Sequence, residues 1–124
     1  MKFFNAHVYV SGPMAGLPDR NFPTFLAEAK RLRELGYVVW NPAEINKDVE
    51  NKTRAECLRA DISALACCNM IQMLPGWRKS QGARLEHRIA KALEMKVFYP
   101  LTPIMSPPSQ ANSTELKGWG CENP

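Results

Sequence analysis

The sequence predicts a single α/β domain in which a parallel sheet of four or five strands is covered by helices on both faces. Three observations indicate this fold. The apolar periodicity switches repeatedly between two and 3.6 residues, as it does where strands and helices alternate. The strand candidates are short and apolar throughout, which is typical of doubly covered parallel strands. The chain has 124 residues, 45% of them apolar, which is enough for one core.

Four short apolar runs are the predicted strands. They are residues 7–11 (HVYVS), 37–40 (YVVW), 70–74 (MIQML) and 96–99 (KVFY). The first three run directly into turn-forming pairs, namely Gly12-Pro13, Asn41-Pro42 and Pro75-Gly76. A ligand loop is therefore expected after the first strand and after the third.

Three longer stretches with helical spacing separate these strands. They are residues 22–35, 53–68 and 80–95. In the first, the apolar face consists of Phe22, Phe25, Leu26, Ala29, Leu32 and Leu35, and Gly36 lies at the C-cap position. The alternation predicts a Rossmann/flavodoxin-like three-layer sandwich. Ligands of such sheets bind beyond the carboxyl ends of the strands, where the strand order reverses.

Composition separates the chain into two parts. Residues 1–102 are predicted to form the α/β domain. Residues 103–124 are rich in Pro, Ser and Asn and are predicted to be an irregular C-terminal arm, of which Trp119 would dock. No apolar run approaches the roughly 18 residues of a membrane span, and the first residues are too weakly apolar for a secretory signal. We expect a soluble cytoplasmic protein without membrane contact.

Charge and cysteine usage limit the expected partners. Sixteen Lys and Arg against 12 Asp and Glu give a net charge of +4, which favours anionic ligands. The excess is small and scattered, so the charge by itself does not predict a nucleic-acid partner, and a small nucleic-acid-associated protein is only the third hypothesis. Cys57, Cys67, Cys68 and Cys121 form no C-x-x-C pair, which argues for reduced thiols in the core and against zinc or disulfides. His7 and His87 are isolated, and neither a metal nor a cofactor is expected.

Two carboxylates are predicted to face the sheet. In the third helix, Glu86 shares its face with Ile89, Ala90 and Leu93, and its i−4 neighbour Gly82 leaves space beside it. In the second helix, Asp61 shares its face with Cys57, Leu58, Ala64, Leu65 and Cys68. A core-facing carboxylate needs hydrogen bonds or a hydrated cavity. Alternatively, Glu86 is a satisfied semi-buried acid, and Asp61 pairs with Arg54 or with backbone amides.

The loop before Glu86 carries the features of an anion site. Ser80 is a good N-cap, and the free N–H groups of the next three residues point towards an incoming anion. Arg78 and Lys79 add positive charge. Plain helix capping explains Ser80 equally well. Trp77 either covers a planar ring of a ligand or fills the core.

These residues resemble motifs of the nucleoside 2-deoxyribosyltransferase-like superfamily, which includes the deoxynucleoside 5′-monophosphate N-glycosidases. The run YVSGP, from Tyr9 to Pro13, is similar to the Tyr-x-x-Gly-Pro of the transferases. Asp61 in RADISAL is similar to the helix Asp ahead of the third strand, and Ser80, Gly82 and Glu86 match the S-x-G-x-x-x-E spacing of the nucleophile motif. The strings SGPM and PGW..S.GA..E look most like a short, uncharacterised, phage-type branch.

The resemblance implies cleavage or transfer at the N-glycosidic bond of a (deoxy)nucleoside or its 5′-monophosphate. Glu86 would be the nucleophile that forms a covalent glycosyl-enzyme, Tyr9 would hold it, and Asp61 would bind a sugar hydroxyl or protonate the leaving base. The implied substrate-binding residues are Ser11, Gly12, Pro13, Met14, Arg20, Asn21, Trp77, Ser80 and Gly82. The runner-up is a non-catalytic nucleotide-binding module of the same fold.

The resemblance also bears on the 5′ group and on assembly. Ser80, with Arg78 and Lys79, favours a phosphorylated substrate, because the monophosphate hydrolases carry Ser at this position. Against a phosphorylated substrate, the first-loop Ser and Arg of those hydrolases fall on Pro13 and Ala15 here, so these phosphate contacts are missing. Arg20 of the same loop is the residue that could substitute for them. A homodimer or larger homo-oligomer is implied, since a neighbouring subunit often completes the site.

Overall fold

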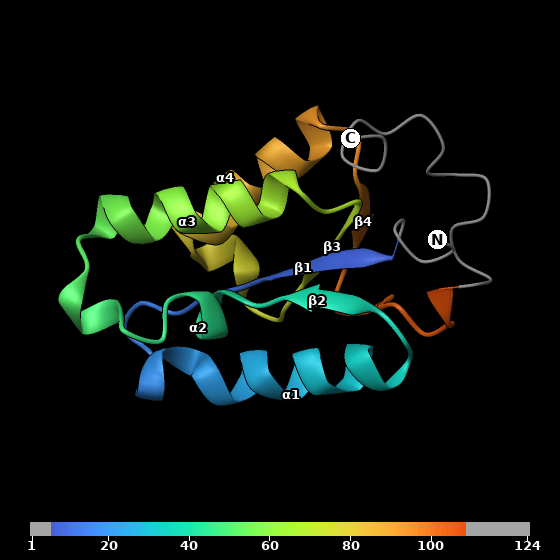
Figure 1. Ribbon diagram of the computed structural model, residues 1–124, viewed down its shortest axis with the longest axis horizontal. Helices are drawn as coiled ribbons and strands as arrows, with labels where there is room; N and C mark the ends of the chain where they lie inside the picture. The colour runs from blue at the N-terminus through green and yellow to red at the C-terminus, as the bar shows by residue number, and fades with distance from the viewer. Residues whose placement is uncertain (1–5, 109–124) are drawn as a thin grey trace.

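The computed structural model describes residues 6–108, which form one four-stranded sheet with helices on both sides (Figure 1). The strands are β1 (His7–Ser11), β2 (Val38–Trp40), β3 (Met70–Met73) and β4 (Lys96–Phe98). They are all parallel, in the order β2-β1-β3-β4. The predicted α/β fold with a parallel sheet is therefore confirmed. The order reverses between β1 and β3, which places the expected ligand position at the carboxyl ends of these two strands.

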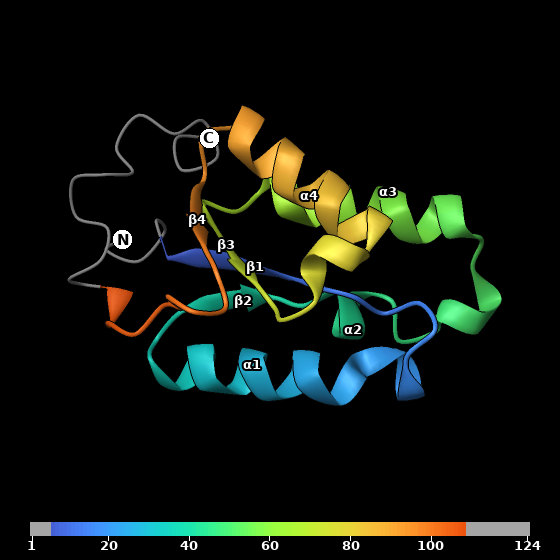
Figure 2. The ribbon, with the colours of Figure 1, turned by 180° about the vertical axis from the view of Figure 1, so that it is seen from behind.

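Four α-helices connect the strands: α1 (Phe22–Glu34), α2 (Pro42–Ile45), α3 (Arg54–Ala66) and α4 (Gln81–Ala92). Helix α1 covers one face of the sheet, and α3 and α4 lie together on the other, as both views of the ribbon show (Figures 1 and 2). Among the described residues, no helix has the length and apolar character that a membrane crossing requires.

The core has two parts because successive side chains of a strand point to opposite faces. Val8 and Val10 of β1 pack against α1 through Phe25 and Leu32. Tyr9, between them, faces α3 and α4 and belongs to the second cluster. This alternation sends Tyr9 and Ser11 to the same side of the sheet as Glu86.

The ends of the helices differ from the sequence prediction by one to three residues. Thr53 and Ser80 are N-caps and not helical: Thr53 forms a capping box with Glu56, and Ser80 accepts from the Ala83 amide. The predicted apolar faces are wrong at two positions, because Leu26 and Leu93 are 46% and 44% exposed. Leu93 follows the last helical residue and so leaves the inward-facing stripe.

Helix α2 and three 3-10 turns were not predicted from the sequence. The turns are Pro18–Asn21, Val49–Asn51 and Trp77–Lys79. Asn41 and Pro42, interpreted as a strand end, also start α2: the Asn41 side chain accepts a hydrogen bond from the Ala43 amide, and Pro42 occupies the first turn. A helix of four residues is too short to show a hydrophobic periodicity in the sequence.

The first residues of the predicted C-terminal arm pack against the domain. Ile104 is buried in the α1-side core, and its amide donates to Gln72 Oε1 at 2.9 Å. Arg31 donates to the Ile104 carbonyl, and Tyr37 donates to the Ser106 carbonyl. The packed part of the chain thus extends past the predicted boundary at residue 102. Trp119 lies outside the described residues.

Candidate active site

A buried glutamate forms the centre of the site. Glu86 of α4 is 6% exposed, and two hydroxyl groups of β1 hold its carboxylate. Tyr9 Oη donates to Glu86 Oε2 at 2.9 Å, and Ser11 Oγ donates to Glu86 Oε1 at 2.6 Å. Each oxygen therefore has its own donor, which fixes the plane of the carboxylate. Ser11 was expected to contact the substrate, but it lies buried beside the glutamate.

Burial raises the pKa of Glu86 from 4.5 to about 7. The hydrogen bond from Ser11 opposes this rise, the negative charge of Asp61 adds to it, and the hydrogen bond from Tyr9 opposes it. Burial and the nearby Glu86 charge raise the pKa of Tyr9 well above 10, so its hydroxyl keeps the donated proton. A carboxylate that titrates near neutrality between fixed donors is a common feature of catalytic sites.

Asp61 of α3 is the second acid of the site, and its partner is Asn46. Asn46 Nδ2 donates to Asp61 Oδ1 at 2.7 Å, and Lys52 Nζ donates to Asn46 Oδ1 at 3.1 Å. The alternative pairing with Arg54 is not what the structure shows. Burial raises the pKa of Asp61 to about 6, against the Asn46 hydrogen bond and the charge of Lys52. The pKa values of the two acids are therefore close, at about 6 for Asp61 and about 7 for Glu86.

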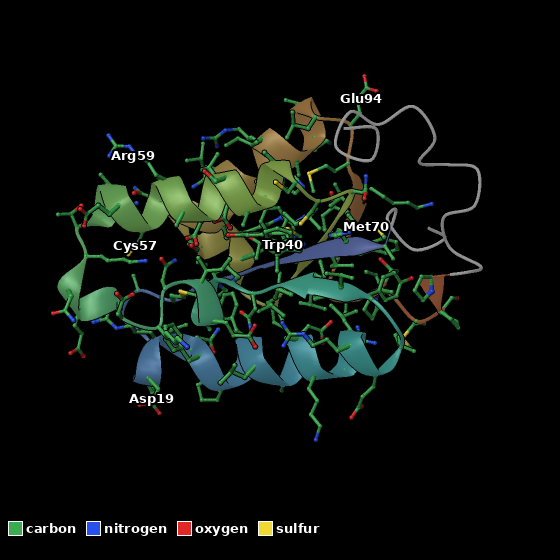
Figure 3. The ribbon with its side chains drawn as sticks, viewed as in Figure 1. Asp19, Trp40, Cys57, Arg59, Met70 and Glu94 are labelled. Atoms are coloured by element: carbon green, nitrogen blue, oxygen red, sulfur yellow. The ribbon has the colours of Figure 1, made fainter. Side chains whose placement is uncertain are left out.

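The outward and inward faces of α3 agree with this placement. Figure 3 shows Arg59 on the side of α3 that points away from the sheet, and Cys57 on the side that points towards it. Cys57 and Asp61 are one helical turn apart and line the same cavity. The sequence prediction for this face of α3 is confirmed.

A cavity of about 490 Å³ opens over the two acids. Its walls come from the loop after β1, from the start of α4 and from the inner side of α3, with Phe25 and Pro42 as apolar wall. Seven residues predicted to form the site line it: Gly12, Pro13, Met14, Asp61, Ser80, Gly82 and Glu86. A cavity of this size is within the range that small organic ligands occupy.

Two glycines leave the space that the cavity needs. A Cβ atom at Gly82 would meet nothing closer than Ser80 Oγ, at 4.0 Å, so this position is open towards the ligand. A Cβ atom at Gly12 would lie 2.7 Å from Leu74 Cβ. Gly12 therefore allows the first loop to pass close to the end of β3.

Two basic residues line the cavity, one just before the start of α4 and one at the start of α3. Ser80 caps this helix, and the next residues, Gln81 and Gly82, also line the cavity. Lys79 and Arg54 are two further lining residues. Positive side chains beside a helix N-terminus favour an anionic group of a ligand. Arg54 was not predicted as a residue of the site. Its position two turns before Asp61, on the same face of α3, is the sequence signal that indicates it.

Besides Ser11, three of the predicted substrate-binding residues lie away from the cavity lining. Arg20 is exposed in the 3-10 turn and does not line the cavity, so the structure does not support it as a phosphate ligand. Asn21 donates from Nδ2 to the Pro13 carbonyl at 2.9 Å and so shapes the first loop instead. Trp77 is buried with its ring 4.4 Å from that of His87 and 6.0 Å from that of Tyr99. Of the two interpretations of Trp77, filling the core is the one observed.

The histidines and cysteines have structural surroundings. Trp40 Nε1 donates to His7 Nδ1, and His87 Nε2 lies 2.9 Å from Tyr99 Oη. Of the described thiols only Cys68 is fully buried, so the expectation of core thiols is wrong for the exposed Cys67. Within residues 6–108, no group of three or more His, Cys, Asp or Glu side chains is arranged to hold a metal ion.

Comparison with known families places most of the chain in one of them. Residues 6–99 match the family model described as a domain of unknown function (DUF4406). The match covers all four strands and both acids of the site, and the chain therefore belongs to this family. No curated protein matches the chain.

Proposed function

We propose that this member of the DUF4406 family cleaves or transfers at the N-glycosidic bond of a (deoxy)nucleoside or of its 5′-monophosphate. The observation that carries the proposal is the position of Glu86. Its carboxylate is buried, held by two hydroxyl groups and directed at a cavity that a second acid shares. Such a carboxylate stabilises or traps the positive character that develops at the sugar C1′ when the bond to the base breaks.

The reaction proceeds by two displacements. An oxygen of Glu86 attacks C1′, a C–O bond forms, and the electrons of the C1′–N bond leave with the base, which takes up a proton. The resulting ester is opened by water, which restores the carboxylate and releases the sugar, or by a second base, which yields a new nucleoside. Asp61 supplies the proton or holds a sugar hydroxyl.

The lining of the cavity favours a substrate with an anionic 5′ group. Lys79 and Arg54 are the cations of the lining, and Ser80, the N-cap of α4, directly follows Lys79. A 5′-phosphate bound at the start of α4 would lie near Lys79, and Arg54 adds a second positive charge to the same cavity. We further propose a homodimer or a larger homo-oligomer as the active assembly.

A panel of nucleosides and 5′-monophosphates, scored for released base, tests this function. We expect release from at least one class, with exchange in the presence of a second base marking a transferase. Glu86→Gln should abolish release and leave ligand binding within about tenfold, which is about 1.4 kcal/mol. Glu34→Gln, which changes an exposed acid of α1, is the matched control and should keep full activity.

The same experiment separates the proposal from a nucleotide-sensing role. A sensor binds its nucleotide without releasing base, and the effect of binding survives Glu86→Gln. Binding by the unchanged protein with no base release from any member of the panel would contradict the catalytic proposal.

A further inference from the structure

A second hollow lies outside the candidate active site. It has a volume of about 360 Å³ and is lined by Trp77, Arg78, Arg84, His87 and Arg88. These residues come from the 3-10 turn Trp77–Lys79 and from the outer side of α4, which lies nearer the viewer than α3 in Figure 2. Three of the five lining side chains are arginines, and none is an acid.

The segment 77–92, which contains all five lining residues, carries a net charge equal to that of the whole chain, +4. Residues 77–92 contain five of the sixteen Lys and Arg and one of the twelve Asp and Glu. The remainder of the chain therefore carries eleven of each sign. The single acid is Glu86, which is buried and faces the other cavity. The surface of this segment is thus more positive than the chain as a whole. The prediction that the excess positive charge is scattered is therefore wrong, because it is concentrated in this segment.

The five cations are exposed and available. They are Arg78, Lys79, Arg84, Arg88 and Lys91. Within residues 6–108 none of them forms an ion pair with an acid. The guanidinium carbon of Arg78 lies 4.8 Å from the centre of the Trp77 ring, which orients this side chain over the hollow. Desolvation and the charges of Lys91 and Arg78 lower the pKa of His87, as expected in a positive field.

The arrangement along α4 matches a linear anion. Arg84, Arg88 and Lys91 are spaced i, i+4, i+7 and share one face. They span about 10 Å of the helix axis. A guanidinium group donates two parallel hydrogen bonds to a phosphate, so two arginines and a lysine in a row fit successive phosphates of one strand.

The surroundings favour a nucleic acid over an acidic protein. A protein interface has an apolar centre, and within residues 77–93 Leu93 is the only exposed large apolar side chain. Interfaces with nucleic acids are polar and strongly positive. We propose that the outer face of α4, with Arg78, binds the phosphate backbone of a single-stranded nucleic acid.

Binding of a fluorescent single-stranded 20-mer of mixed sequence, measured at 50 to 200 mM salt, tests the proposal. The triple variant Arg84→Gln, Arg88→Gln, Lys91→Gln should bind at least tenfold more weakly at 50 mM salt. Each phosphate contact adds about 0.7 to the slope of log affinity against log salt for a single strand, so the slope should fall by about 2. Glutamine preserves helix propensity, and circular dichroism verifies the fold of the variant.

The control variant removes the same number of positive charges at positions outside this segment. Lys30→Gln, Lys47→Gln, Arg59→Gln changes three exposed cations outside residues 77–92 and should stay within about threefold of the unchanged protein. Equal losses in both triple variants, or no binding by the unchanged protein at 50 mM salt, would overturn the proposal. Base release from a free nucleotide should be the same in both triple variants. A failure of the nucleic-acid proposal can therefore be distinguished from a failure of the proposed function.

Discussion

Ser11 and Glu86 are 75 residues apart in the chain, and the Ser11 hydroxyl lies 2.6 Å from the Glu86 carboxylate. The contact is the shorter of the two that hold Glu86, and it joins the carboxyl end of β1 to the second turn of α4. A short O–H···O⁻ bond favours the ionised form of the acid. The loop end of β1 thus keeps a buried glutamate reactive near neutral pH.

Removing this hydroxyl is expected to affect Glu86 more than removing that of Tyr9. Both hydrogen bonds lower the pKa of Glu86, and that of Ser11 lowers it more. Ser11→Ala should therefore shift the acidic limb of the pH profile for base release to higher pH by more than Tyr9→Phe does. A larger shift in Tyr9→Phe would contradict this order.

The pH dependence of base release follows from the state of Glu86. With a pKa of about 7, the nucleophile loses its charge below neutrality, so kcat/KM should fall about tenfold per pH unit below pH 6. Asp61 has a pKa of about 6. A second, alkaline limb that disappears in Asp61→Asn identifies Asp61 as the proton donor. A plateau above pH 7 identifies it as a ligand of the sugar.

Glu86→Gln is expected to stabilise the fold at high pH. The unfolded chain loses the Glu86 proton near pH 4.5 and the folded chain near pH 7, so the free energy of unfolding falls between these values and stays low above them. The variant should gain about 3 kcal/mol at pH 8 and almost nothing at pH 4.5. Denaturant unfolding at both pH values measures this. A loss of stability at both would mean that Glu86 serves the fold and not a reaction.

Asn46 is expected to act as a positioning residue for Asp61. Asn46→Ala removes the donor to Asp61 Oδ1 and should raise the pKa of Asp61 above about 6. Lys52→Gln removes only the more distant charge and should raise it less. Carbon NMR titration of the Asp61 carboxyl measures both without reference to activity. An unchanged pKa in Asn46→Ala would remove this role.

Gly82 and Gly12 should respond differently to added side chains. Gly82→Leu places its side chain in open space at the cavity wall, so it should block ligand binding while leaving the melting temperature close to that of the unchanged protein. Gly12→Ala brings a Cβ atom against Leu74 and should cost about 1–3 kcal/mol of stability. Calorimetry on both variants, with ligand binding measured in parallel, distinguishes the two positions.

The fold was predictable because its main signals are local. The first three strands ended at or near a turn-forming pair, and each long helix showed one apolar face. The inward direction of Glu86 and Asp61 followed from the same spacing and agrees with the structure. Both were recognisable because a carboxylate on an apolar stripe breaks the pattern of its helix.

The remaining features depend on contacts that spacing does not encode. Trp77 fills the core because His87 and Tyr99 lie beside it, and neither is its neighbour in the sequence. Asn46 reaches Asp61 from the end of a four-residue helix that had no periodic signal. The excess of basic residues around α4 could be counted in the sequence. That the single acid among them, Glu86, is buried and leaves the surface purely positive is known only from the packed structure.

Gln72 connects the centre of the sheet to a segment that the ribosome synthesises later. Its side chain is buried in β3, donates to the Tyr99 carbonyl and accepts from the Ile104 amide, 27 and 32 residues further on. Until that segment leaves the ribosome, the amide lacks these two partners in a region that excludes water, which is unfavourable. The nascent chain consequently completes the native packing around Gln72 only after residue 104 has emerged.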